Sequence, residues 1–155
     1  MLGRVNLGGT AIGTGINAPA HYQELALAAL SRISHNHIQA APDLIAATSD
    51  MGDFVLVSGY LKRTATKLSK IANDLRLLSS GPRAGLNEIH LQARQPGSSI
   101  MPGKVNPVIP EAMNMAAFQV IANDLAITLA ADAGQFQLNA MEPLIAFKLF
   151  DSLDL

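Results

Sequence analysis

The clearest pattern in the sequence is a set of mostly apolar residues, spaced alternately by three and four positions, between residues 54 and 78. The set consists of Phe54, Val57, Leu61, Thr64, Leu68, Ile71, Leu75 and Leu78. This spacing is the heptad seam of a helical bundle or coiled coil. Ser79-Ser80-Gly81-Pro82 then ends the helix, with glycine and proline in the order typical of a helix stop. One helix cannot bury such a seam alone, so the pattern predicts partner helices.

Two shorter segments before the seam also have helical spacing. A helix is predicted from about Pro19 to Ser34, and His35-Asn36-His37 ends it. Its expected buried stripe consists of Tyr22, Leu25, Ala29, Leu30 and Ile33. Residues 43–48, after Pro42, are expected to form a short helix or turn. Within the seam helix, Lys70 and Asp74 are placed to pair one turn apart.

The region after residue 105 predicts two more helices. One starts at Asn106-Pro107, with Asn106 as the N-cap and Pro107 in the first helical position, and runs to about Asp132. Because this helix is apolar almost all round, it is expected to be central. The other begins near Glu142-Pro143 and continues to Leu155 without a cap or glycine. We therefore expect an all-α bundle of long helices, truncated within its last helix.

Composition narrows the classes of protein that remain. The chain has 155 residues, 49% hydrophobic and 15% charged, enough for one domain with a core. A net charge of −1 favours neither nucleic acid nor an anionic membrane surface. No uninterrupted apolar run reaches the roughly 18 residues of a membrane span. The absence of cysteine excludes disulfides and thiolate metal sites, and His35 and His37 are too close in sequence to clamp a metal from one helix. A cytoplasmic protein without metal or cofactor is expected.

Candidate chemistry gathers in the serine loop, residues about 95–107. This segment presents Ser98, Ser99, Lys104 and Asn106 just before a predicted helix amino terminus. Unpaired N–H groups and the positive end of the helix dipole favour a bound anion there, and Lys104 adds a full positive charge. The residues therefore predict a carboxylate- or phosphate-binding loop with a hydroxyl beside it. The alternative is a polar loop between helices with an ordinary asparagine cap.

A second glycine-rich segment, from Gly8 to Gly15, could be mistaken for a phosphate-binding loop. It lacks the Gly-Lys-Ser/Thr ending of a Walker motif and the third glycine of a dinucleotide fingerprint. No strand is expected before it, so a backbone turn is the better interpretation. Thr14 or Asn17 is the side chain most suited to line a site there.

The serine-loop sequence, Gly97-Ser98-Ser99-Ile100-Met101-Pro102-Gly103-Lys104-Val105-Asn106-Pro107, resembles the signature of the aspartase/fumarase superfamily at every fixed position. Residues 9–17, 71–86 and 134–143 resemble three further segments of that family, so the resemblance covers most of the chain. It implies that residues 1–155 are part of the central helical-bundle domain of the family fold, carrying the serine loop.

The resemblance also implies roles for individual residues. Ser99 matches the general base, Lys104 and Asn106 match positions that hold substrate carboxylates, and Ser98 lies beside them. Glu111 matches an acid that the family pairs with an active-site histidine, although an acid in a first helical turn is also favoured by the dipole alone. The family assembles each active site from three subunits of a tetramer. Its two earlier conserved blocks are not found in this sequence, so we expect the chain alone to be inactive.

Within the superfamily, residues 82–89 and 133–136 resemble aspartases more than fumarases. The resemblance therefore implies an ammonia-lyase that reversibly deaminates L-aspartate to fumarate by anti-elimination, with a small dicarboxylate as its partner and no cofactor. Two alternatives stay open: a fumarate hydratase of the same superfamily, and a non-catalytic helical module that oligomerises through its seams.

Overall fold

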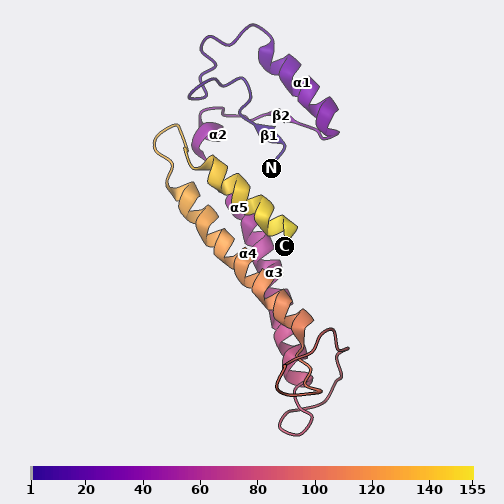
Figure 1. The fold of residues 1–155 in the computed structure, drawn as a ribbon. Coiled ribbons are helices and arrows are strands. Elements are labelled where there is room, and N and C mark those ends of the chain that lie inside the picture. The colour runs from indigo at the N-terminus through magenta and orange to yellow at the C-terminus, as the bar shows by residue number, and fades with distance from the viewer. Residues whose placement is uncertain (1) are drawn as a thin grey trace. The chain divides into compact units, whose positions relative to one another are not determined.

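The computed structural model describes residues 2–155 and contains five helices in that range (Figure 1). They are α1 (Tyr22–Ser34), α2 (Ala46–Ser49), α3 (Gly52–Leu78), α4 (Val108–Asp132) and α5 (Glu142–Asp154). Two strands of two residues each, β1 (Arg4–Val5) and β2 (Gln39–Ala40), pair in parallel with Arg4 opposite Gln39. The predicted all-α bundle is confirmed, and each predicted helix is present with its ends shifted by three residues or fewer.

The chain divides into two compact units. The first contains the described residues up to Ser58 together with Leu125–Phe150. The second contains Gly59–Asp124 together with Asp151–Leu155, and it holds the serine loop.

In the first unit, β1 corrects one expectation, because a strand does precede the segment Gly8–Gly15. Its two residues are too short for periodicity to reveal them. The Ser31 hydroxyl donates to the Ile38 carbonyl and accepts from the Ile38 N–H, at 3.1 and 3.0 Å, and so attaches α1 to the segment entering β2. The predicted buried stripe of α1 is wrong for this chain, since α1 has no buried residue and Ile33 is 72% exposed. No element of the described chain covers that face.

Asn139 joins the end of α4 to the start of α5 within the first unit. Its Nδ2 donates to the carbonyls of Ala130 and Ala131, at 3.0 and 3.3 Å, and its Oδ1 accepts from the Met141 N–H at 2.8 Å. The side chain is 2% exposed. One amide thus satisfies carbonyls that the end of a helix leaves without partners and an N–H at the start of the next helix.

In the second unit, α3 and α4 lie side by side and run antiparallel (Figure 1). Ala65 of α3 packs against Ala117 and Val120 of α4, with Leu61 against the edge of this cluster. The buried positions of α3 in this unit are small: Ala65, Ser69 and Ala72. The predicted seam of large residues is mostly not buried, and Leu68 and Ile71 are exposed. Small side chains let the two helix backbones approach, so α3 turns this face to α4 in place of the seam.

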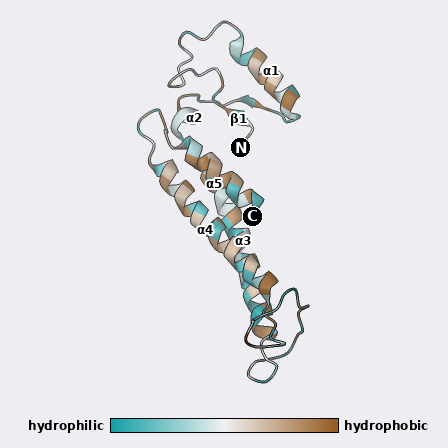
Figure 2. Cartoon of the chain, in the orientation of Figure 1, coloured by the Kyte–Doolittle hydropathy of each residue, from teal (hydrophilic) through white to brown (hydrophobic). Residues whose placement is uncertain are grey.

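The expectation of a fully central α4 is also wrong for this chain. One face is buried along most of the helix, the opposite face exposes Met115, Phe118, Leu125 and Leu129, and Ile109 and Met113 are exposed near the start of the helix. Figure 2 shows the hydrophobic residues of α4 and α5 in brown. By length and composition alone α4 is the one helix among residues 2–155 that could cross a membrane, a weak indication because core helices of soluble proteins meet the same criterion. Length and mean hydropathy alone do not exclude α4 as a membrane-spanning helix, although Glu111 and Asp124 interrupt its apolar sequence.

Candidate functional site

The serine loop closes on itself through two hydrogen bonds. The Gly97 N–H donates to the Lys104 carbonyl at 2.8 Å, and the Asn106 Nδ2 donates to the Gly97 carbonyl at 3.2 Å. A third bond, from the Lys104 N–H to the Met101 carbonyl at 3.1 Å, forms the turn at the tip, where Gly103 has a φ of 81°. Residues 97–106 therefore have a defined backbone shape.

The Asn106 bond corrects its predicted role as an N-cap. Its amide closes the loop, and the helix begins two residues later, at Val108. The first helical hydrogen bond runs from the Glu111 N–H to the Pro107 carbonyl at 3.1 Å. An asparagine just before a helix that starts with proline can cap the helix or close the preceding loop. The sequence alone therefore could not decide between these two roles.

The two serine hydroxyls differ in their surroundings. Ser98 is half-buried, and its Oγ accepts from the Ile100 N–H at 3.3 Å. Ser99 is exposed, and its hydroxyl has no hydrogen-bond partner among residues 2–155. The Ser99 hydroxyl is therefore fully available to an external molecule, whereas the Ser98 oxygen already accepts one hydrogen bond.

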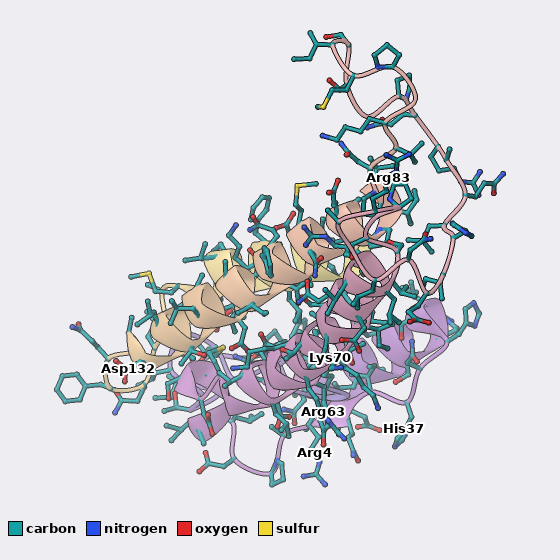
Figure 3. All side chains as sticks on the ribbon, turned by 90° about the horizontal axis from the view of Figure 1, so that it is seen from below. Arg4, His37, Arg63, Lys70, Arg83 and Asp132 are labelled. Atoms are coloured by element: carbon teal, nitrogen blue, oxygen red, sulfur yellow. The ribbon has the colours of Figure 1, made fainter. Side chains whose placement is uncertain are left out.

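A cleft of about 570 Å³ lies beside the loop in the second unit. Residues 103–107, which include Lys104 and Asn106, line one part of it, and residues that follow α3 line the rest: Ser79, Gly81, Pro82, Asn87, Ile89, His90, Leu91 and Ala93. Every polar side chain in the lining can donate a hydrogen bond, and none is a carboxylate. Arg83, labelled in Figure 3, adds positive charge to the same connecting segment. The cleft suits an anion.

The structure brings Lys104 and Asn106 together in this cleft, whereas Ser98 and Ser99 are not among the residues that line it. Glu111 lies half-buried in the first turn of α4, and no histidine among residues 2–155 pairs with it. The roles of Ser99, Ser98 and Glu111 thus stay predictions. Sequence reasoning missed Asn87 and His90 as lining residues, since only the fold of the loop after α3 places them near Lys104.

A second cleft, of about 440 Å³, lies within the first unit and has the opposite character. Its charged lining residues are Arg4 and four acids, Asp43, Asp50, Asp53 and Glu142. Two of these acids are engaged in local turns, because Asp43 accepts from the Ala46 N–H and Asp50 from the Gly52 N–H. No group of three or more potential metal ligands forms in the part of the chain that the structure describes. This cleft does not suit a carboxylate ligand.

Comparison with known proteins gives consistent results. The family described as "Lyase" matches residues 1–122. Aspartate ammonia-lyase of Pseudomonas fluorescens is 73% identical over 155 residues, which are 100% of this chain and 32% of the relative. The crystal structure of fumarate lyase:delta crystallin from Brucella melitensis bound to cobalt has a TM-score of 0.93 at 61% identity, over 98% of this chain and 33% of that one.

Recombinant class II fumarase from Schistosoma mansoni has a TM-score of 0.94 at 35% identity, over 99% of this chain and 35% of that chain. The chain thus spans about a third of the length of the relatives that it matches. Sequence identity is about twice as high with the aspartate ammonia-lyase as with the fumarase. With its family signature in a defined loop, and a family match over residues 1–122, the chain belongs to the lyase family of the aspartase/fumarase superfamily.

Proposed function

We propose that this chain is the carboxylate-binding, serine-bearing part of an ammonia-lyase that converts L-aspartate reversibly to fumarate and ammonia. The observation that carries the proposal is the cleft beside the serine loop, which is lined by both Lys104 and Asn106 and by no acidic residue. A dicarboxylate needs such a site, because two negative charges must be compensated by donors that are already in place. The 73% identity with an aspartate ammonia-lyase supports the choice of substrate.

In the proposed reaction Ser99 acts as the general base. Its alkoxide takes a proton from the carbon β to the amino group, the C–H electrons form the new double bond, and the protonated amino group leaves from the opposite face as ammonia with the electrons of the broken C–N bond. The proton is weakly acidic, so the charge that develops on the adjacent carboxylate needs stabilisation, which Lys104 and Asn106 would supply. The exposed Ser99 hydroxyl, with no internal hydrogen bond, is consistent with this role.

A serine at its ordinary pKa is a poor base, so the loop has to favour its ionisation. Positive charge and backbone N–H donors close to the oxygen would do so. Because Ser99 is not in the cleft lining, the proposal requires the loop tip to move toward bound substrate. Ser98 would contact the substrate from the same loop, and Glu111 would support a histidine from a part of the longer protein outside this chain.

The exposed apolar residues of α4 support a further part of the proposal, a homotetramer held together by long helices. The cytoplasm is the location that we propose for it. Phe118, Leu125 and Leu129 are each about 60% exposed. Covering them would contribute about 25 cal/mol for each Å² of apolar area removed from water. Light scattering should therefore detect oligomers, whereas a strictly monomeric chain would contradict assembly through these faces.

One alternative enzyme has a specific observation in its favour. The match to a class II fumarase, with a TM-score of 0.94, shows that the fold is shared by a protein named for hydration chemistry. A fumarate hydratase would use the same anion-binding cleft and differ in the group that handles water in place of ammonia. A non-catalytic helical module is the third possibility, supported by the exposed apolar faces alone.

The proposal is tested by complementation. The chain is coexpressed with the remaining segments of the Pseudomonas fluorescens enzyme as separate polypeptides, and fumarate formation is measured from L-aspartate and from L-malate. We expect no turnover by the chain alone and turnover of L-aspartate by the reconstituted assembly. Preference for L-malate would establish the fumarase alternative. A complex that assembles without any turnover would favour the non-catalytic module.

A further inference from the structure

A buried polar layer joins α3 to α4 near the cleft. Asn114 of α4 is 3% exposed, and its Nδ2 donates to the Ser69 Oγ at 2.8 Å and to the Ser69 carbonyl at 3.1 Å. Its Oδ1 accepts from the Arg76 Nη1 at 3.2 Å. Both ends of the amide are therefore satisfied by α3. Sliding one helix along the other would leave these groups buried without partners, so the layer fixes the register of the pair.

The layer is connected to one wall of the cleft through the end of α3. The Arg76 carbonyl accepts from the Ser79 hydroxyl at 3.2 Å. The next residue, Ser80, accepts from the Leu86 N–H at its Oγ, at 3.1 Å, and from the Asn87 N–H at its carbonyl, at 2.7 Å. Ser79 and Asn87 are lining residues. Arg76 therefore links the layer to this wall, with its side chain bonded to Asn114 and its backbone carbonyl bonded to Ser79.

The other wall belongs to α4. Residues 103–107 line the cleft and continue directly into that helix. Asn114 follows Pro107 by seven residues, about 10 Å along a helix at 1.5 Å per residue. The two walls of the cleft are thus the continuations of two helices, and Asn114 with Ser69 and Arg76 holds those helices together two turns away.

We propose that Asn114 is a positioning residue for the cleft and touches no ligand itself. Through Ser69 and Arg76 it sets the distance between the two walls. One wall bears Asn87, and the other bears Lys104 and Asn106. The identity of the ligand, a dicarboxylate, rests on the proposed function. The positioning itself does not, because it concerns the fold of the unliganded chain.

Asn123 provides a matched control on the same helix. It is 1% exposed, and its amide is also satisfied on both sides: Oδ1 accepts from Gln119 at 2.9 Å, and Nδ2 donates to Asp151 at 2.8 Å and Ser152 at 3.0 Å. It joins α4 to the end of α5, and its side chain makes no hydrogen bond to α3 among residues 2–155. It follows Asn114 by nine residues, about 13 Å farther from the cleft.

The first test uses the full 155-residue chain without ligand. Amide hydrogen exchange is measured by NMR in the wild type, Asn114→Leu and Asn123→Leu, at a denaturant concentration for each that equalises their global stability. We expect the Asn87 amide to exchange roughly tenfold faster in Asn114→Leu only, the factor given by a hydrogen bond worth about 1.4 kcal/mol. Equal exchange in the two variants would overturn the proposal. If Asn114→Leu does not fold, Ser69→Ala, which removes one acceptor, gives the same comparison.

The second test adds fumarate to the same chains and follows the amide signals of Lys104 and Asn106. Asn114→Leu should weaken the apparent affinity by roughly tenfold, and Asn123→Leu should match the wild type. Equal weakening by both variants would contradict positioning by Asn114. Failure of the wild type to respond to fumarate, both alone and in the reconstituted assembly, would count against the proposed function, and the exchange experiment would still decide the positioning role.

Discussion

Replacing Gly97 with alanine would perturb the serine loop at the point where it closes. An added Cβ at this position would lie 2.7 Å from the Lys104 carbonyl oxygen, 3.0 Å from the carbonyl carbon and 3.2 Å from the Asn106 nitrogen. All three are backbone atoms, so no change of side-chain rotamer relieves the contact. The loop has to open, and opening lengthens the bond from the Gly97 N–H to the Lys104 carbonyl, now 2.8 Å.

The magnitude follows from the bonds that close the loop. Opening weakens the Gly97–Lys104 bond and the 3.2 Å bond from the Asn106 side chain to the Gly97 carbonyl. At about 0.5–1.5 kcal/mol for each bond, the closed loop should lose about 1–3 kcal/mol relative to open forms. Because the loop is largely exposed, little of this loss should appear in global unfolding, where the free energy of unfolding should change by less than about 1 kcal/mol.

The assay combines amide hydrogen exchange at position 97 with fumarate binding. Gly97→Ala should accelerate exchange there by roughly 5- to 150-fold and weaken fumarate binding, since Lys104 and Asn106 move with the loop. Gly103→Ala is the matched control: its φ of 81° makes alanine unfavourable by about 1 kcal/mol, but no atom lies within 4 Å of the added Cβ. Wild-type exchange in Gly97→Ala, or equal exchange in the two variants, would refute the described closure.

Four further substitutions, with Lys70→Met as the control for Lys62→Met, test the packing of the helices by denaturant unfolding. Lys62→Met removes an ion-pair partner of Asp124, whose side chain is 7% exposed, and should lower the free energy of unfolding by about 1–3 kcal/mol. Lys70→Met breaks a solvent-exposed pair and should lower it by less than about 1 kcal/mol. Equal losses in the two variants would contradict the difference in burial. Asn139→Ala should cost about 2–3 kcal/mol, because it leaves helix-end carbonyls and an N–H without partners, and a loss below 1 kcal/mol would show that water replaces the amide. Gly59→Ala should stabilise the chain by about 0.5–1 kcal/mol, since the helical position has open space for a Cβ, and destabilisation would reveal a hidden contact.

The sequence was sufficient to predict the helices because their signals are local. Three- and four-residue spacing, Gly81-Pro82 after the long helix and Pro107 before the next one act within a few residues of the helices they delimit. The placement of Lys104 and Asn106 together next to a helix amino terminus was predictable for the same reason, since they lie two residues apart in the sequence, and anion binding by the loop stays a prediction. The ion pair between Lys70 and Asp74 also follows from spacing along one helix, and it is present.

Which face each helix buries was not predictable in the same way. The contact between α3 and α4 uses Ala65 and Ser69, whose small side chains add little to a hydrophobic pattern dominated by leucine and isoleucine. Asn114 and Asn123 are buried because distant partners satisfy their amides, whereas polarity alone would place them at the surface. The same limit applies to Asn87 and His90, which reach the cleft only through the path of the loop.

In the proposed reaction Ser99 supplies the base for elimination from a dicarboxylate held by Lys104 and Asn106. The most direct measurement is kcat for fumarate formation from L-aspartate by the reconstituted assembly, comparing Ser99→Ala with Ser98→Ala. A positioned general base contributes typically 10²–10⁴-fold, so kcat should fall by about that factor in Ser99→Ala while the oligomeric state is unchanged. The loss in Ser98→Ala should be smaller, because its hydroxyl is already engaged by the Ile100 N–H. Wild-type kcat in Ser99→Ala would contradict the assignment of the base.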